Sequence, residues 1–343
     1  MQHRINPNPL GPYAEPMSEA VSACVHCGFC LPTCPTYQVM GEEMDSPRGR
    51  IFLMKEVLEG QLELSASLPY VDNCLGCLAC VTACPSGVAY GDLLTPFRAL
   101  AEKERERPFV DKVLRTVILE TLPYPHRFRL ASQMGQLAKL LTKFLPPKFL
   151  PQKFKDMMQL LPENLPKREA LASHYPAKGP ARAKVILLSG CAQQVLAPEI
   201  NQASLNILSH NGVEVLVPPA QGCCGALAAH TGAMARAKAF AKHNLKVFES
   251  LLNEVDAVIS NAAGCGSGLH EYALWLKGSP EEDKAQKLSA KSQDISVFLN
   301  QLGLIAPPKL SQPIKVAYHD ACHLAHAQGV LNRQGRYSKH QKA

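Results

Sequence analysis

The sequence contains no long apolar run. No part of its 343 residues approaches the roughly 18 apolar residues that a membrane-spanning helix needs. Residues 1–16 also lack the apolar segment of a secretory signal. We therefore expect a cytoplasmic protein, either free in the cytoplasm or peripheral on the cytoplasmic face of the inner membrane.

Aromatic and charged residues are also scarce. Aromatic residues make up 6% of the chain and no nucleic-acid-reading motif is present, so we expect no nucleic-acid partner. The charged content of 19% argues against extensive disorder, and the apolar content of 46% is enough for packed cores. A chain of this length is typical of about two domains.

The sequence also lacks an evident active site for substrate chemistry. Residues 264–268 read GCGSG and do not have the GxGxxG spacing of a dinucleotide-binding loop. His319, His323 and His326 lie at helical spacing after an expected strand, but without a placed carboxylate partner they are more typical of residues on a helix face. We therefore expect no catalytic residues on this chain, and no residues that bind an organic cofactor.

Cysteine is abundant, and eight of the thirteen cysteines form two copies of one motif. The motif C-x2-C-x2-C-x3-C-P begins at Cys24 and again, fifty residues later, at Cys74. A zinc site has no use for the third CxxC step, whereas such a run holds a cubane iron–sulfur cluster. In two-cluster ferredoxins the fourth cysteine of each run ligates the other cluster. We predict two [4Fe–4S] clusters, one on Cys24, Cys27, Cys30 and Cys84 and one on Cys74, Cys77, Cys80 and Cys34; eight zinc-bound or structural cysteines are the alternative.

Each cysteine ladder leads into an expected helix. Ser46-Pro47 and Thr95-Pro96 both have an N-capping side chain followed by proline at the first helical position. Gly60 is a plausible C-terminal cap of the first of these helices. Ladders separated by whole helices indicate an α-helical ferredoxin-like domain, which we place at residues 14–107.

Several residues near the ladders are candidates for adjusting a cluster's reduction potential. The backbone N–H groups of Gly28, Gly76 and Gly87 could donate hydrogen bonds to sulfur. Three arginines near the helix starts could act through their charge, or could simply pair with surface carboxylates. These arginines are Arg48, Arg50 and Arg98.

A basic, proline-rich connector is expected at residues 108–181. Residues 123–155 contain seven basic residues and no acidic residue, and apolar residues recur among them at helical spacing. Such a helix could lie on anionic lipid, dock a partner or pack on its own chain. The basic residues are Arg127, Arg129, Lys139, Lys143, Lys148, Lys153 and Lys155, and the apolar ones are Leu130, Met134, Leu137, Leu140, Leu141, Phe144 and Leu145.

The pattern changes to alternating strands and helices at residues 182–305. Strands are expected at 184–188, 213–217 and 257–260, with helices at 198–210, at about 232–253 and then through Leu302, which predicts a parallel sheet. A cysteine follows each strand, and parallel strands present their carboxyl ends at one edge. We expect these cysteines to converge on a metal or redox site, although each one alone is more typical of a buried small residue. They are Cys191, Cys223, Cys224 and Cys265.

We expect the same module to begin again at residues 312–343. Residues 314–318 lead to Cys322 much as the strand at 184–188 leads to Cys191. Too few residues follow Cys322 for a complete copy, so we expect residues 329–343 to be poorly ordered or displaced.

Three motifs carry a family resemblance. CVHCGFCLPTCPTY (residues 24–37), SPRGRIFLM (46–54) and DNCLGCLACVTACPSGV (72–88) resemble the iron–sulfur subunit family of glycolate oxidase. Related families include subunits of lactate-utilisation complexes, anaerobic glycerol-3-phosphate dehydrogenase and heterodisulfide reductase. AAGCGSGLHEY (262–272) and HDACHLAHAQG (319–329) favour glycolate oxidase within this group.

The resemblance implies an electron-transfer role. A partner subunit would carry FAD and oxidise glycolate to glyoxylate, and this chain would pass the electrons through two [4Fe–4S] clusters toward a membrane quinone. It also implies that residues 182–305 form a cysteine-rich "CCG" module, which is normally present twice. Heterodisulfide reductase relatives close that module with CxxC, whereas Gly266, Ser267 and Gly268 follow Cys265 here. A further cluster on this module is therefore left open.

Overall fold

Short helices make up the N-terminal part of the chain. The computed structural model describes residues 1–141, 156, 158–167, 170–305, 312, 315 and 317–330. Its first helices share one core, in which Met17, Val21, Met54, Val71, Leu93 and Phe97 are buried. The helices of this part of the chain are η1 (Asn8–Tyr13), α1 (Ala14–Ala23), α2 (Pro35–Met40), η2 (Glu43–Asp45), α3 (Pro47–Leu58), α4 (Leu64–Asn73), α5 (Ala79–Thr82) and α6 (Tyr90–Glu104).

The predicted start and end of the helix after the first ladder are confirmed. Ser46 Oγ accepts a hydrogen bond of 3.0 Å from the N–H of Gly49, and Pro47 is the first residue of α3. At the other end, Gly60 has a φ of +71° and its N–H donates to the carbonyl of Val57. A side chain could not replace Gly49, because its Cβ would lie 2.0 Å from the Glu43 carbonyl oxygen.

The matching prediction for the second ladder is wrong. Thr95 and Pro96 lie inside α6, which begins at Tyr90. Tyr90, Leu93 and Leu94 are all buried, so packing extends the helix upstream of the proline. This burial outweighs the loss of one helical hydrogen bond and the clash at proline, which cost about 3 kcal/mol in a helix interior.

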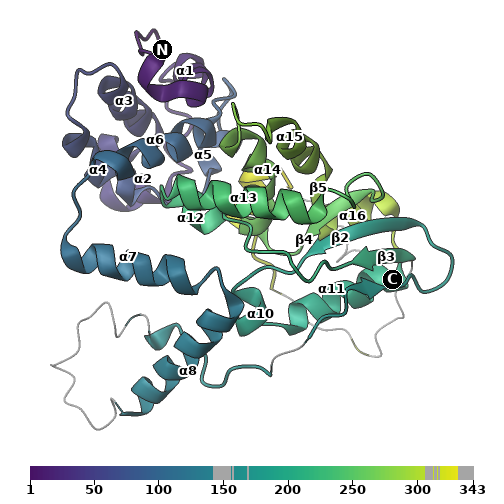
Figure 1. The fold of residues 1–343 in the computed structure, drawn as a ribbon. Helices are drawn as coiled ribbons and strands as arrows, with labels where there is room; N and C mark the ends of the chain where they lie inside the picture. Colours follow the sequence, from purple (N-terminus) through teal and green to yellow (C-terminus); the bar gives the residue numbers. More distant parts are fainter. Residues whose placement is uncertain are drawn as a thin grey trace.

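The predicted basic helix is present in part. α7 spans Phe109–Thr121 and α8 spans Pro125–Leu141. The remainder of the expected helix, at residues 142–145, lies outside the described residues. Figure 1 shows α7 and α8 extending beside the two main lobes of the molecule.

The C-terminal lobe contains a five-stranded sheet in the order β1-β3-β2-β4-β5. The three predicted strands are confirmed as β2 (Ala183–Leu188), β3 (Val213–Leu216) and β4 (Ala257–Ser260), and they are parallel neighbours. The prediction missed β5 (Ser292–Asp294), which is parallel, and β1 (His174–Tyr175), an antiparallel edge strand. Both are too short to show a strand pattern in the sequence.

Helices cover both faces of this sheet (Figure 1). On one face Ile186 and Leu188 pack with residues of α13–α15; on the other Val185 and Leu187 pack with residues of α11 and α16. The predicted helix at 232–253 is shorter, because it begins at Met234 and ends at Phe248. The helices of this lobe are α10 (Gln193–Leu196), α11 (Glu199–His210), α12 (Ala226–His230), α13 (Met234–Phe248), α14 (Ala263–Trp275), α15 (Glu282–Lys291) and α16 (Ile295–Leu302).

The last described segment packs on both lobes. Its π-helical turn η5 (His323–Ala327) contacts α5 of the N-terminal lobe and α14 of the C-terminal lobe. Of the strand expected at 314–318, residues 314 and 316 lie outside the described residues, and the others form no strand. The expected displacement is wrong for Val330, which is buried and donates to the Leu324 carbonyl, whereas residues 331–343 lie outside the described part.

Candidate metal centres

The first cavity lies against the first cysteine ladder. Its empty space, open solvent included, is about 410 Å³, and the four cysteines predicted to hold the first cluster line it together with Cys80. Cys24 directly follows α1, while Cys84 follows α5 and donates its N–H to the Val81 carbonyl. This cavity therefore brings together the sulfur-bearing residues Cys24, Cys27, Cys30 and Cys84.

A second cavity, of about 310 Å³, lies against the other ladder. Cys74 directly follows α4, and Cys34 is the residue before α2. Cys80 lines this cavity as well as the first. The cavity therefore brings together Cys34, Cys74, Cys77 and Cys80, which are three residues of one ladder and the last cysteine of the other.

The two ladder loops have matching backbones. His26 and Gly76 hold equivalent positions in the two motifs and have φ values of +58° and +64°. Gly28 and Leu78 are also equivalent, with φ values of +86° and +60°. Left-handed residues at two fixed positions turn each loop around its cavity, even where the residue is not glycine.

The donor set fits iron–sulfur clusters better than single ions. Among the described residues, no three or more His, Cys, Asp or Glu side chains close on one point as ligands of a metal ion. The cysteines instead surround cavities, as ligands of a larger inorganic group must. Burial raises the pKa of the Cys24, Cys30, Cys77 and Cys80 thiols, so a bound group would have to supply the positive charge that keeps them deprotonated.

Backbone N–H groups donate to sulfurs of both ladders, including those of Cys24, Cys30 and Cys77, whereas side-chain donors are unevenly distributed. Cys74 Sγ accepts from the Gly76 N–H at 3.5 Å and from the Tyr90 hydroxyl at 3.7 Å. Burial raises the pKa of Tyr90 well above its usual value, so this hydroxyl keeps its proton. Of the predicted glycine donors, Gly76 therefore reaches a sulfur, whereas the Gly87 N–H donates to the Cys84 carbonyl.

Arg50 also reaches a sulfur of the second cavity. Its Nη1 lies 3.7 Å from Cys34 Sγ, and its Nε donates to the Tyr70 carbonyl. Its Nη2 pairs with Asp45 at 2.8 Å, and the two side chains are 1% and 2% exposed. Pairing with a surface carboxylate therefore does not describe Arg50, because both members of the pair are buried.

The other two predicted arginines act on the backbone of the ladders. Arg48 pairs with Glu43 at 2.7 Å, is partly exposed, and donates to the His26 carbonyl at 3.0 Å. Arg98 donates at 2.6 Å to the carbonyl of Cys74 and also to the carbonyl of His230 in the other lobe. Both arginines thus fix the loops that carry the cysteines.

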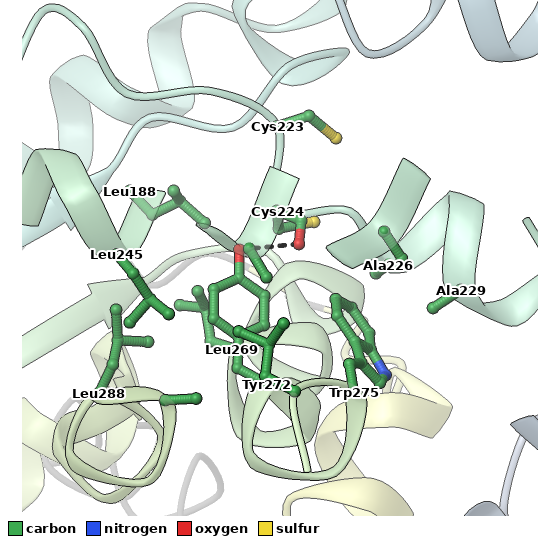
Figure 2. Packing of buried hydrophobic residues seen from close by; sticks show 14 of the residues in the cluster. Leu188, Cys223, Cys224, Ala226, Ala229, Leu245, Leu269, Tyr272, Trp275 and Leu288 are labelled. Atoms are coloured by element: carbon green, nitrogen blue, oxygen red, sulfur yellow. Dashed lines mark hydrogen bonds between the residues drawn. The ribbon is translucent and has the colours of Figure 1, made fainter. Parts of the chain in front are cut away.

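The four cysteines of the C-terminal lobe do converge. Side-chain hydrogen bonds link Cys191 to Cys223, Cys223 to Cys224 and Cys224 to Cys265. Cys223 and Cys224 are buried (Figure 2). The pKa of Cys223 is raised to about 12: the hydrogen bond from Cys191 opposes the rise, but the bond to Cys224 and burial outweigh it. Without a bound group the thiols of Cys191, Cys223 and Cys224, whose pKa is raised, are therefore protonated.

Sequence reasoning missed the polar residues that hold this cysteine pair. The Tyr272 hydroxyl donates to the Cys224 carbonyl at 2.9 Å, as Figure 2 shows, and Asn244 donates to the Cys223 carbonyl. Asn244 also donates to the Tyr272 oxygen, so the three groups form one network. Asn244 and Tyr272 lie mid-helix in α13 and α14, where nothing in the sequence marks them as different from core residues.

The histidines of the C-terminal segment have partners that the sequence did not indicate. The His323 ring packs against the His230 ring at an interplanar angle of 43°, with centroids 5.2 Å apart, and His230 pairs with Glu271 at 3.0 Å. His326 Nδ1 lies 2.8 Å from Thr82 Oγ1 in the second ladder. The segment therefore joins the second ladder to α14.

Comparisons with known proteins agree with this architecture. Residues 20–88 match the family described as a 4Fe-4S dicluster domain, and residues 185–270 match the family described as a cysteine-rich domain. The glycolate oxidase iron–sulfur subunit of Escherichia coli is 36% identical over 308 residues, or 89% of this chain and 72% of that protein. The probable glycolate oxidase iron–sulfur subunit of Bacillus subtilis is 38% identical over 315 residues, or 88% of this chain and 70% of that protein.

This chain belongs to the glycolate oxidase iron–sulfur subunit family. The predicted fold class is confirmed: a helical, ferredoxin-like 4Fe–4S domain precedes an α/β cysteine-rich domain. The chain is thus an iron–sulfur protein whose family members are subunits of oxidoreductases.

The family also has more distant relatives. Lactate utilization protein A of Halalkalibacterium halodurans is 31% identical over 147 residues, or 43% of this chain and 59% of that protein.

No solved structure matches this chain. In the described part of this family member, none of the helices is both long enough and apolar enough to cross a bilayer.

Proposed function

We propose that this chain carries electrons from an FAD-containing dehydrogenase subunit, which oxidises glycolate to glyoxylate, toward a membrane quinone. The observation that carries this proposal is the pair of neighbouring cavities, each lined by cysteines of both ladders. The glycolate oxidase relatives add the substrate.

In this proposal the protein's part is to hold two [4Fe–4S] clusters at fixed positions. Such clusters, when bound, accept and release single electrons. One would be held by Cys24, Cys27, Cys30 and Cys84, and the other by Cys34, Cys74, Cys77 and Cys80. Buried Tyr90 lines both cavities and excludes water between them.

We further propose residues 14–107, 108–181 and 182–305 as the structural units, with another module starting at residue 312.

Substrate choice can be tested on the copurified complex of this chain with its flavoprotein. We expect dye reduction with glycolate to exceed that with lactate or glycerol 3-phosphate by at least about tenfold, since a single misplaced group typically costs 1–3 kcal/mol of discrimination. The measurement is the initial rate of dye bleaching for each substrate. Faster bleaching with lactate would assign the chain to the lactate-utilising relatives instead, and the flavoprotein alone is the control.

A zinc-binding interaction protein is the alternative of a different class. Iron and acid-labile sulfide of about eight each per chain, with the broad visible absorption of thiolate–iron bonds, support two clusters. A colourless protein with stoichiometric zinc would overturn the assignment.

We also propose that α7 and α8 rest on an anionic membrane surface. Phe109, Val110, Val113 and Val117 of α7 are 45–79% exposed, and Leu130, Met134 and Leu137 of α8 are 59–64% exposed. We call these seven residues the α7–α8 apolar surface. The other side of α8 packs on its own chain, where Ser132 is buried. One face of α8 therefore packs on the chain, as one expectation had it, and the opposite face is free for lipid. The excess of basic residues at 123–155 complements anionic lipid.

Vesicle binding tests this surface. Met134→Glu in the full chain is expected to weaken binding to phosphatidylglycerol-containing vesicles about tenfold, because one buried apolar side chain contributes about 1.5 kcal/mol. Cosedimentation measures the bound fraction. Val39→Glu is the matched control, because Val39 is 83% exposed on α2, away from this surface. Equal binding by the unsubstituted chain, Met134→Glu and Val39→Glu would contradict the proposal.

A further inference from the structure

The donors around the two cavities differ in a way that affects electron affinity. Among the described residues, every side-chain hydrogen bond to a ladder sulfur ends on Cys34 or Cys74. Arg50 and Tyr90 donate to these sulfurs. The Thr36 hydroxyl lies 3.2 Å from Cys34 Sγ and donates to the Asp45 carbonyl at 3.1 Å; a deprotonated Cys34 can only accept, so this hydroxyl would then donate to the sulfur. Both sulfurs belong to the second cavity.

Hydrogen bonds to sulfur stabilise the reduced form of a cluster, because reduction adds negative charge that the thiolates share. Charge acts in the same direction. The Arg98 guanidinium lies on the Cys74 carbonyl, and within the described residues no carboxylate pairs with it. The second cavity thus has both more side-chain donors and an uncompensated positive charge.

Two positive groups near the first cavity act in the opposite sense. Arg48 lies near Cys30, but Glu43 neutralises it at 2.7 Å and it is partly exposed. The ammonium of Met1 donates to the Cys24 carbonyl rather than to its sulfur, and it also donates to the exposed Ser22 carbonyl. Solvent screens both charges, whereas the donors of the second cavity are in direct contact with sulfur.

We infer that the group held by Cys34, Cys74, Cys77 and Cys80 has the higher reduction potential, so that electrons enter at the first cavity and leave from the second. This inference rests on the proposed ligand sets. One electron leaves the first centre, which is oxidised, and reduces the second; the flavoprotein supplies it and the quinone accepts it.

The surroundings of the two cavities fit this direction. Cys27 of the first cavity is exposed, and so are its neighbours Val25 and Phe29. The second ladder instead packs against the C-terminal segment, through Thr82 and His326. A donor protein can therefore approach the first centre. Leu75, which lines the second cavity, is 68% exposed and leaves that centre open to an acceptor.

Potentiometric titration of the purified, cluster-loaded chain, followed by EPR, tests the inference. Tyr90→Phe removes one hydrogen-bond donor to Cys74 Sγ. We expect it to lower the reduction potential of the higher-potential centre and to leave the other centre unchanged. At a fixed applied potential, the ratio of reduced to oxidised higher-potential centre should then fall roughly fivefold. Thr36→Val is expected to shift the same centre in the same direction. Arg50→Lys is expected to do so as well, but it disturbs a buried pair, so Tyr90→Phe and Thr36→Val carry the test.

Tyr37→Phe is the matched control. It removes a hydroxyl from α2 that makes none of these hydrogen bonds, and both potentials are expected to stay unchanged. A shift of the lower-potential centre in Tyr90→Phe, an equal shift of both centres or no shift of either would overturn the inference. The iron content distinguishes failure of this inference from failure of the proposed function. Eight irons per chain with unshifted potentials would reject the inference and leave the two-cluster assignment in place.

Discussion

Cys27→Ala combined with Cys84→Ala is expected to remove about half of the bound iron, which is no more than either substitution alone. Cys27 and Cys84 line the same cavity although they belong to different ladders. If they hold one cluster together, losing either one removes that cluster, and losing both adds nothing further. Iron and acid-labile sulfide per chain provide the measurement.

The pair Cys27→Ala and Cys34→Ala gives the contrasting result. These two residues belong to the same ladder but line different cavities, so almost all of the iron should be lost. If each ladder held its own cluster without exchange, the outcomes of the two double variants would be reversed. Cys322→Ala is the control, because Cys322 is exposed and lines neither cavity; it should keep the full iron content.

The positions of Cys84 at the first cavity and Cys34 at the second could be predicted, because the ladder spacing carries its own chemistry. Three thiolates on one tight loop occupy three corners of a cubane, and the fourth must come from elsewhere. The convergence of Cys191, Cys223 and Cys265 was also predictable, since parallel strands end at one edge of a sheet. In both cases a regular spacing determines a position in space.

The donors to sulfur could be predicted only in part. Arg50 was a candidate through its place after the first ladder, but nothing in the sequence showed that Asp45 would be buried beside it. Tyr90 could not be identified, because the sequence favoured a helix start at Thr95, five residues after it. Contacts of this kind depend on how α3, α4 and α6 pack, and that packing has no local signature.

The Arg50–Asp45 pair also predicts a large effect on stability. Asp45 Oδ1 accepts from Arg50 Nη2 at 2.8 Å and from Asn73 Nδ2 at 3.1 Å, so one carboxylate joins η2, α3 and α4. Asp45→Ala leaves the guanidinium buried without its counter-charge. The free energy of unfolding is expected to fall by about 3–5 kcal/mol, the usual cost of removing one partner of a buried pair. Denaturant unfolding of the cluster-loaded protein under anaerobic conditions measures it.

Glu43→Ala is the matched control, because Glu43 pairs with Arg48 only a few residues away but at a partly exposed position. Its loss should cost at most about 1 kcal/mol. The double variant Asp45→Ala, Arg50→Met distinguishes an unpaired charge from lost packing. It should regain most of the stability lost in Asp45→Ala, because replacing a whole buried pair by apolar groups is often neutral. If the double variant is less stable than Asp45→Ala, the guanidinium stabilises the fold through Tyr70 and Cys34 rather than through its partner carboxylate.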